Sequence, residues 1–472
     1  MDGGSRAVNG RGRAGRESRL ARELALAGRA RPEGRMARLR RWLEPGMGLK
    51  RWLLVVFLGE LCLAAAGALL VRQVYRELGT EGPGEPLFYL LTLQFFPGIS
   101  RILVLLGAGA ALFLFGSWRL LTALLEPFTR REPLVELIYQ KRSLARGPRV
   151  VAMGGGTGLS TLLRGLKQVT SNITAIVTVA DDGGSSGKLR DELGIAPVGD
   201  IRNCIAALAD AEPAMTRLLQ YRFPSQTPAH AGLSGHSFGN LLIAALSAVE
   251  GDFEEGVRQS NRVLAVRGQV LPVAPVPLTL HAERADGTIL DGQSVITRST
   301  GIRRVWITPA DIRASAEAVK AIAEADVIVL GPGSLYTSVL PSLLVPEIRE
   351  ALLSAAALRV YVCNVATQVG ETEGYTLGDH LEALAAHGAG ELLDLVLAND
   401  NFLANAPENY PAAPVRIDAP PPTVGSAGLV LRDVVDDANA HHHDPVKLAA
   451  ALLEILAEHG ASRRMLSVAR TA

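Results

Sequence analysis

The sequence predicts an α/β protein: a parallel β-sheet covered by helices on both faces, with a small antiparallel insertion, preceded by an all-α two-helix transmembrane hairpin. Three observations lead to this prediction. Near-continuous apolar runs alternate with helical patterns from Arg149 onward, which is typical of buried parallel strands. Alternating short apolar runs and turn pairs between Gly268 and Thr308 indicate the antiparallel insertion. Two long, nearly uncharged runs near the N-terminus indicate membrane helices.

The hairpin prediction rests on the runs Trp52–Val71, which has one charged residue, Glu60, and Ile102–Trp118, which has none. Each run is about long enough to cross a bilayer core. Basic residues mark both outer flanks, so the positive-inside rule puts both ends in the cytoplasm. We therefore expect a multi-pass protein of the cell membrane, in contact with the lipid bilayer, with its large C-terminal domain in the cytoplasm.

Two alternatives to the hairpin stay open. The first run could be a signal peptide, especially if translation began at Met47, although the second run would then remain as an anchor. The two runs could also be buried helices of a soluble domain, although their length and lack of polar faces disfavour this.

Composition excludes some function classes. The chain of 472 residues has a net charge of +1, so overall electrostatics favour no particular partner. The basic N-terminal tail has almost no aromatic residues, which favours anionic lipid over nucleic acid, and we expect no nucleic-acid partner. Cys62, Cys204 and Cys363 are scattered without disulfide or metal-ligand spacing, which suits a reducing compartment.

These patterns divide the chain into five segments: a basic flexible tail (1–50), the transmembrane hairpin (51–125), a linker (126–148), the α/β domain (149–455) and a C-terminal tail (456–472). Within the α/β domain the predicted strands are "RVVAM", "ITAIVTVA", "DVIVL", "RVYVC" and "LDLVLA". Each is followed by a glycine-containing or polar loop. Ligands of open parallel sheets bind where strands end and helices begin, so these loops are the candidate site.

The loop after the second strand carries Asp181 and Asp182, which are the candidate catalytic residues. Glycines and hydroxyls follow them, and the binding candidates there are Asp181, Asp182, Gly183, Gly184, Ser185 and Ser186. A carboxylate at that edge can orient sugar hydroxyls, hold a divalent cation or act as a base, and the sequence leaves these three roles open.

The loop "MGGGTGLS" follows the first strand and opens a helix, which is the context for phosphate binding at a helix N-terminus. It is neither a Walker A loop nor a G-x-G-x-x-G motif. A tight structural turn is therefore an equal alternative to a phosphate cradle. The candidate residues are Gly154, Gly155, Gly156, Thr157 and Gly158.

Other polar groups fall at the same predicted edge of the sheet, and their number favours a binding site. They are Ser334, Thr337 and Ser338 in "GPGSLYTS" with its glycines Gly331 and Gly333, Asp200, Arg202 and Asn203 in "GDIRN", His236 and Asn240 in "GHSFGN", and Asn364, Thr367, Gln368 and Glu371 in "NVATQVGET". We expect no metal at His441–His443, because consecutive histidines do not easily face one ion. Asp444 before Pro445 is better explained as a helix cap.

These motifs, in this order, resemble those of the YvcK-like gluconeogenesis factors, which belong to the wider family of the 2-phospho-L-lactate transferase CofD. The resemblance covers about Arg149 to Ile455. It implies a Rossmann-like fold that binds nucleotide-containing ligands. Family members are associated with growth on gluconeogenic carbon sources, cell shape and peptidoglycan precursor supply, and UDP-N-acetylglucosamine binding is known among them.

The resemblance also implies roles for residues. Gly154–Gly158 would face the nucleotide phosphates, and Asp181 with Asp182 matches an acidic pair shared with the magnesium-dependent transferase branch. The following "GGSSG" matches the YvcK branch and departs from the transferase branch. His236, Asn240, Ser334, Thr337, Thr367 and Gln368 match further motif positions.

The leading hypothesis is a membrane-anchored regulator that binds UDP-N-acetylglucosamine, acts on a cell-wall synthesis protein as partner, and forms a homodimer. Under this hypothesis the chain is a binding protein rather than an enzyme. The rival hypothesis is a phosphotransferase of the 2-phospho-L-lactate transferase type, which would use Asp181 or Asp182 with Mg²⁺. No other cofactor is expected under either hypothesis. A third is a membrane adaptor whose ligand site is vestigial.

Overall fold

The computed structural model describes residues 142–210, 212–224, 232–404, 412–420 and 423–471, with side chains as far as 459, and isolated residues between 57 and 115. The chain divides into two units, Met1–Leu124 and Leu125–Ala472. Almost all of the basic tail and of the predicted transmembrane hairpin lies outside the described residues. Among those described, no helix combines the length and the apolar character that a membrane crossing needs.

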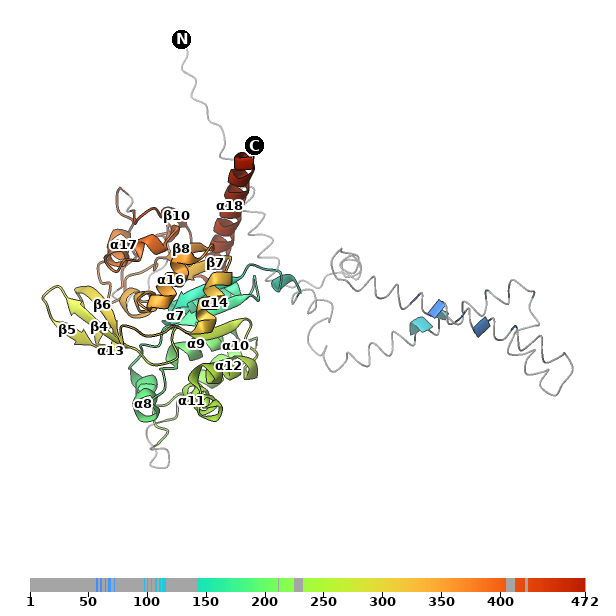
Figure 1. The fold of residues 1–472 in the computed structure, drawn as a ribbon, viewed down its shortest axis with the longest axis horizontal. Helices are drawn as coiled ribbons and strands as arrows, with labels where there is room; N and C mark the ends of the chain where they lie inside the picture. The colour runs from blue at the N-terminus through green and yellow to red at the C-terminus, as the bar shows by residue number, and fades with distance from the viewer. Residues whose placement is uncertain are drawn as a thin grey trace, which may run out of the picture. The chain divides into compact units, whose positions relative to one another are not determined.

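The second unit is built on a seven-stranded parallel sheet with the strand order β10-β9-β8-β7-β1-β2-β3 (Figure 1). Its strands are β1 (Val150–Gly154), β2 (Ile173–Val177), β3 (Gln269–Pro272), β7 (Val327–Leu330), β8 (Leu358–Val362), β9 (Leu395–Asn399) and β10 (Gly428–Arg432). This confirms the predicted parallel α/β domain.

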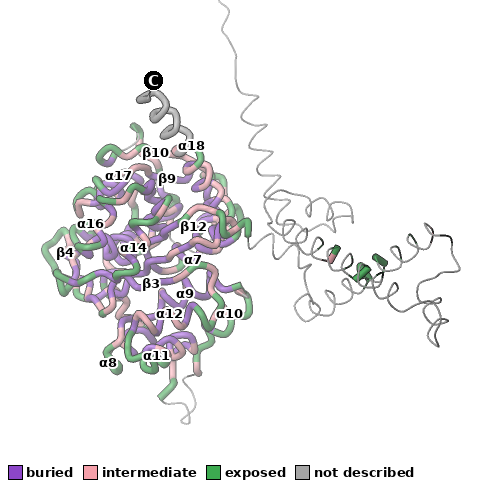
Figure 2. The backbone as a smooth tube through the Cα atoms, turned by 45° about the vertical axis from the view of Figure 1, so that its right-hand side comes forward, coloured by how far each residue is buried: buried purple, intermediate pink, exposed green. Residues whose placement is uncertain are grey.

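The strands are hydrophobic throughout because helices cover both faces of the sheet. Every residue of β1 and of β7 is buried. The buried backbone gathers in the interior of the domain, and exposed backbone lies mostly at its rim (Figure 2). The covering helices are α7 (Gly156–Leu166), α8 (Gly184–Leu193), α9 (Gly199–Leu208), α10 (Glu212–Gln220), α11 (Phe238–Glu250), α12 (Phe253–Val263), α14 (Ala316–Glu324), α15 (Leu340–Leu343), α16 (Pro346–Ser354), α17 (Leu377–Ala386) and α18 (Pro445–Thr471). Short turns at η2 (Leu335–Val339) and η3 (Gly390–Leu392) join them.

The antiparallel insertion exists, but it begins later than predicted. It consists of β4 (Thr279–Arg284), β5 (Ile289–Asp291) and β6 (Ile302–Thr308), with the short helix α13 (Gln293–Ile296). The segment Gln269–Pro272, which the prediction included in it, is instead the edge strand β3 of the main sheet and pairs parallel with β2. A four-residue apolar run does not show by its pattern which sheet it joins.

Two further features were not predicted from the sequence. The strand β10 extends the main sheet beside β9, and the hairpin of β11 (Val435–Asp436) and β12 (Asn439–His443) precedes the last helix. In addition, α18 continues to Thr471, past Ile455, where the sequence pattern suggests a helix end.

The strand order reverses beside β1: β2 and β3 lie on one side of it, and β7 to β10 on the other. In doubly wound sheets, the crevice at the carboxyl ends of the strands at such a switch point is where ligands bind. The fold therefore directs attention to the loops after β1 and β7.

Gly165 in α7 lies against the start of α18. A β-carbon at Gly165 would overlap the carbonyl group of Pro445 and press on the Ala449 side chain. In an open helix, Gly→Ala stabilises by about 0.5–1 kcal/mol. Here we expect Gly165→Ala to lower the free energy of unfolding by about 1–3 kcal/mol, because the helices must move apart. Urea unfolding measures this, and a stabilised variant would contradict the close helix contact.

Candidate functional site

A cavity of about 540 Å³ opens at the carboxyl ends of β1, β7 and β8, next to the switch point. Its size is in the range that small-molecule sites commonly have. Four segments line it: the start of α7, the loop after β7, the loop after β8, and strand β12. The lining residues are Gly155, Gly156, Thr157, Gly158, Thr161, Gly333, Ser334, Asn364, Val365, Ala366, Thr367, Gln368, Asn439, His441, His442 and His443.

The glycine loop leads from β1 directly into α7, whose first helical residue is Gly156. The first backbone N–H groups of a helix have no partner within it, so this end of α7 favours an anion. Gly156 has a φ of +67°, a left-handed conformation that glycine adopts without strain. The predicted phosphate cradle therefore has the required backbone geometry.

The glycine loop also packs tightly against its neighbours. A β-carbon at Gly158 would lie 2.6 Å from the carbonyl oxygen of Pro332 and 2.9 Å from the backbone nitrogen of Gly333. A β-carbon at Gly155 would collide with the Asp200 carboxylate. Gly158 thus allows the start of α7 to lie against the loop after β7, and this contact shapes one wall of the cavity. Gly155 leaves room for the Asp200 side chain.

The loops after β7 and β8 are held together by hydrogen bonds between side chains and backbone. The Asn364 amide donates to the Gly333 carbonyl at 2.9 Å, and Gly333 N–H donates to Asn364 Oδ1 at 3.0 Å. Ser334 Oγ donates to Gln368 Oε1 at 2.6 Å. Ser334 and Gln368 both line the cavity, so this hydrogen bond orients two of the polar side chains in its wall.

The two adjacent acids, Asp181 and Asp182, have different partners. Asp181 Oδ1 accepts a hydrogen bond from Gly183 N–H at 2.9 Å. Asp182 Oδ1 accepts one from Ser294 N–H at 2.8 Å, at the start of α13, and so ties the loop to the antiparallel insertion. Neither residue is among those lining the cavity. In this structure Asp182 acts as an anchor for the insertion.

Asp200 lies half-buried at the start of α9 and near Asp181. Burial and the Asp181 charge raise the pKa of Asp200 to about 6, against the opposing effects of a Gly156 hydrogen bond and the Arg202 charge. Asp181 and Asp200 thus form a pair of neighbouring carboxylates behind the glycine loop.

The motifs "DDGGSSG", "GDIRN" and "GHSFGN" meet in one buried polar network. Ser185 Oγ lies 3.1 Å from His236 Nδ1, and the Asn240 amide donates to Ser185 Oγ at 3.0 Å. Arg202, which is 5% exposed, donates to Asn240 Oδ1 at 2.9 Å. These residues brace α8, α9 and α11 against each other.

The structure thus separates the predicted residues into two groups. Those that line the cavity are Gly155, Gly156, Thr157, Gly158, Gly333, Ser334, Asn364, Thr367 and Gln368. Those that are not among its lining residues are Gly154, Asp181, Asp182, Gly183, Gly184, Ser185, Ser186, Asp200, Arg202, Asn203, His236, Asn240, Gly331, Thr337, Ser338 and Glu371. Ligand contact by the second group stays a prediction.

The predicted site residues do not include the part of the wall formed by Thr161, Asn439 and the three histidines. Thr161 lies one helical turn after Thr157, so helical spacing could have identified it. The placement of β12 opposite the glycine loop has no such local signal.

The three histidines of this wall differ in their surroundings. His443 is buried, its Nε2 lies 3.2 Å from the Cys363 carbonyl oxygen, and burial lowers its pKa to about 4. His442 is exposed. Asp444 accepts from the N–H groups of Val446 and Lys447 at 2.7 and 2.8 Å, which confirms the predicted helix cap. Within the described part of the chain, no three His, Cys, Asp or Glu side chains are grouped as metal ligands.

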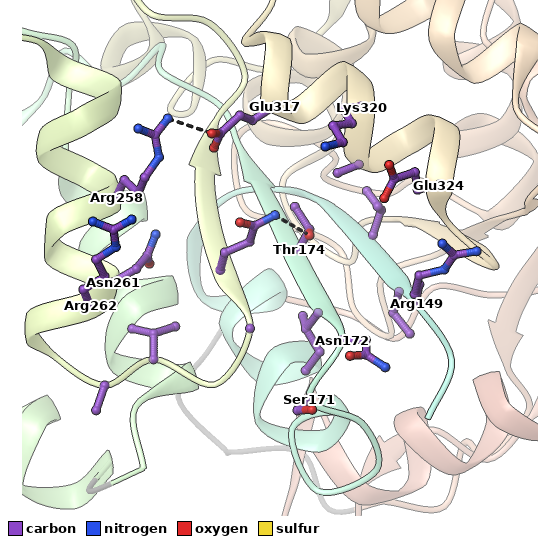
Figure 3. Close-up of a pocket in the computed structure, with 18 residues that line it drawn as sticks. Arg149, Ser171, Asn172, Thr174, Arg258, Asn261, Arg262, Glu317, Lys320 and Glu324 are labelled. Carbon is purple, nitrogen blue, oxygen red and sulfur yellow. Dashed lines mark hydrogen bonds and ion pairs between the residues drawn. The ribbon is translucent and has the colours of Figure 1, made fainter. Parts of the chain in front are cut away.

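A second cavity, of about 720 Å³, lies at the opposite edge of the sheet, at the amino ends of β1, β2 and β3 (Figure 3). Its walls are α12 and α14, which an ion pair between Arg258 and Glu317 at 2.7 Å links. Arg262 lies in the last turn of α12, where a cation offsets the negative end of the helix dipole. The ion pair and the helix dipole thus give Arg258, Glu317 and Arg262 stabilising roles, and we do not assign this cavity as the functional site.

Comparisons with known proteins agree with the motifs. A family model described as 2-phospho-L-lactate transferase CofD matches residues 150–429. The Bacillus subtilis gluconeogenesis factor is 46% identical over 67% of this chain and all of its own length. A crystal structure of a Bacillus halodurans protein is 46% identical, has a TM-score of 0.61, and covers 65% of this chain and all of that one.

A longer relative, a gluconeogenesis-factor homologue from Nostoc sp., is 44% identical over 91% of this chain and 95% of its own length. The unit Leu125–Ala472 is too short to account for that coverage, so the similarity extends into the N-terminal unit. By the family model and by these relatives, the chain belongs to the gluconeogenesis factor family of CofD-like proteins.

Proposed function

We propose that this protein binds UDP-N-acetylglucosamine in the switch-point cavity and, through that binding, regulates cell-wall precursor supply and cell shape. The observation that carries the proposal is the cavity itself: about 540 Å³, at the carboxyl ends of β1, β7 and β8, with the N-terminus of α7 opening into it. That position and that volume suit a nucleotide ligand.

Different walls of the cavity suit different parts of such a ligand. The diphosphate would lie at the start of α7, where the backbone N–H groups of Thr157 and Gly158 are available to an anion, while the Gly156 N–H bonds to Asp200. The hydroxyl of Ser334 and the amides of Asn364 and Gln368 would contact sugar or base. Side chains that both donate and accept hydrogen bonds match sugar hydroxyls and an N-acetyl group.

Binding without turnover is favoured by the engagement of the acids. Asp182 is bonded to the insertion, and Asp181 to its own loop. The alternative is a magnesium-dependent phosphotransferase of the 2-phospho-L-lactate transferase type, which the proximity of Asp181 and Asp200 favours. Magnesium is commonly held by one or two carboxylates together with substrate phosphates, and these two residues would be its protein ligands.

We also propose that the N-terminal unit anchors the protein in the membrane as a two-helix hairpin and that the protein acts as a homodimer on a cell-wall synthesis protein. The support is the two nearly uncharged runs and the extension of similarity with the Nostoc relative into this unit. The α/β domain would then lie on the cytoplasmic side, as the basic flanks favour.

Isothermal titration calorimetry of the full-length protein with UDP-N-acetylglucosamine, UDP-glucose and GTP, with and without Mg²⁺, tests the ligand. We expect selective, saturable binding of the amino sugar nucleotide without a need for metal. Absence of saturable binding to every UDP-sugar would overturn the proposal. Magnesium-dependent binding of GTP with heat that continues after saturation would favour the transferase.

A further inference from the structure

Glu371 is a buried carboxylate, 1% exposed, directly behind the switch-point cavity. It receives four hydrogen bonds. Its Oε1 accepts from the backbone N–H groups of Tyr336 and Thr337 at 2.6 and 3.1 Å. Its Oε2 accepts from Thr337 Oγ1 at 2.9 Å and from Gln368 Nε2 at 3.2 Å.

These bonds connect Glu371 to two cavity-lining side chains. Because Gln368 donates through Nε2 to Glu371, its Oε1 faces Ser334 and accepts the Ser334 hydroxyl hydrogen. The Ser334 oxygen then keeps its lone pairs for the cavity. One carboxylate therefore fixes which end of the Gln368 amide points to Ser334, and with it the hydrogen-bonding direction of the Ser334 hydroxyl.

Glu371 also holds the turn that carries Ser334. The segment η2, Leu335–Val339, is a π-helix, a geometry that often occurs at functional sites. The Tyr336 and Thr337 N–H groups at its start are bonded to Glu371. The loops after β7 and β8 are thus joined at one buried acceptor.

We propose that Glu371 is a positioning residue for the ligand: through Gln368 it orients Ser334, and through the N–H groups of η2 it fixes the loop that presents Ser334 to the cavity. This inference rests on the proposed function, because it concerns the same site. It adds a residue that does not line the cavity to the determinants of affinity.

The orientation of Gln368, and through it that of Ser334, depends on the ionisation of Glu371. Burial raises the pKa of Glu371 to about 7, although its hydrogen bonds favour the charged form. A proton on Oε2 would remove the acceptor of the Gln368 amide and free Gln368 to turn. Two tyrosines lie beside Glu371: Tyr336, whose N–H bonds to it, and Tyr375, whose hydroxyl lies 3.0 Å from that of Tyr336. The further titratable groups around these tyrosines are Asp379, His380 and His387.

The variant Glu371→Gln separates the two functions of the side chain. Its amide oxygen still accepts from the η2 N–H groups, but its NH₂ group faces the NH₂ group of Gln368, so both cannot be satisfied. We expect affinity for UDP-N-acetylglucosamine at pH 8 to fall about tenfold, as for one lost buried hydrogen bond. The matched control is Glu347→Gln, which makes the same change at an exposed carboxylate that accepts from Ala314 N–H, away from the cavity.

The pH profile distinguishes positioning from general destabilisation. Wild-type affinity should weaken as the pH falls from 8 to 6, because Glu371 is protonated through its pKa near 7. Glu371→Gln lacks this titrating carboxyl group, whereas the side chains that line the cavity are the same in both proteins. The difference between wild type and Glu371→Gln should therefore shrink as the pH falls. An affinity of Glu371→Gln within twofold of wild type at pH 8 would overturn the inference.

Hydrogen–deuterium exchange of the ligand-free protein gives a readout that does not need binding. Neutral amide oxygens accept hydrogen bonds more weakly than carboxylates. The peptide covering 333–339 should therefore exchange faster in Glu371→Gln than in wild type, and at the wild-type rate in Glu347→Gln. Faster exchange without wild-type nucleotide binding would refute the proposed function and keep the positioning role of Glu371. Unchanged exchange would refute the positioning role, whatever the binding result.

Discussion

Replacing Arg202 by methionine is expected to lower the free energy of unfolding by about 3 kcal/mol, the largest stability effect that we predict. Arg202 is buried and donates to Ser237 Oγ at 2.6 Å, Asn240 Oδ1 at 2.9 Å and Asn203 Oδ1 at 3.0 Å. Methionine fills a similar volume, but it leaves Asn240 Oδ1 without a donor in the described structure. Ser237 Oγ keeps the Asn240 N–H as a donor and Asn203 Oδ1 keeps the Gln220 amide, so each of these two acceptors loses one of its two hydrogen bonds. A buried unsatisfied acceptor costs about 1–3 kcal/mol, and each lost hydrogen bond costs about 0.5–1.5 kcal/mol.

The expected loss is smaller than the sum of those terms because the substitution also removes a buried charge. Burial and the nearby Arg222 lower the pKa of Arg202, which shows that the site is unfavourable for a cation in itself. Part of the cost of losing the hydrogen bonds is therefore offset.

Urea unfolding monitored by circular dichroism measures this effect. The matched control is Arg222→Met, because Arg222 is exposed and its side chain donates to the Gly235 carbonyl at 3.1 Å rather than to the buried network. We expect the control to change the free energy by less than about 0.5 kcal/mol. Equal effects of the two variants would mean that the network does not brace α8, α9 and α11.

Much of the fold follows from the sequence because the central strands are buried on both faces. β1, β2, β7, β8 and β9 each lie within an apolar run that a polar loop ends. The edge strands β3 and β10 are less apparent. β3 has four residues and ends at Pro272, and β10 is only half-buried, so neither gives a strong signal.

The position of the site was predictable for the same reason, since carboxyl ends of parallel strands share one edge. Contacts between individual side chains were not. Asp181 and Asp182 are adjacent in sequence, yet one bonds within its loop and the other bonds to α13, more than a hundred residues later. Only the path of the chain through the insertion determines that difference.

The glycines are the point at which sequence and site geometry agree most closely. The sequence indicates glycine-rich loops at "GGGTG" and "GPGS", and the structure shows that a β-carbon at Gly158 would collide with the second loop. The two loops meet backbone to backbone beside the cavity, so a single methyl group at the contact must displace one of them.

For this reason the variant Gly158→Ala is expected to weaken UDP-N-acetylglucosamine binding about a hundredfold, the largest effect on binding that we predict. Its β-carbon would lie 2.6 Å from the Pro332 carbonyl oxygen, and no flexible side chain is there to yield. The backbone of α7 or of the Gly333 loop must shift, and a misplacement of about 1 Å can cost a hundredfold in a site that depends on exact positions. Such overpacking lowers stability by about 1–3 kcal/mol, so the fold should persist.

Calorimetric titration of full-length Gly158→Ala measures the loss, with Gly232→Ala as the matched control because a β-carbon at Gly232 meets no atom within 4 Å. Circular dichroism checks that both variants are folded. If Gly158→Ala bound the nucleotide sugar as tightly as Gly232→Ala, the ligand would not depend on the contact between the loops after β1 and β7, and the switch-point cavity could not be its site. A loss confined to Gly158→Ala would tie the affinity to this contact, because both variants add the same methyl group and only one of them moves the cavity wall.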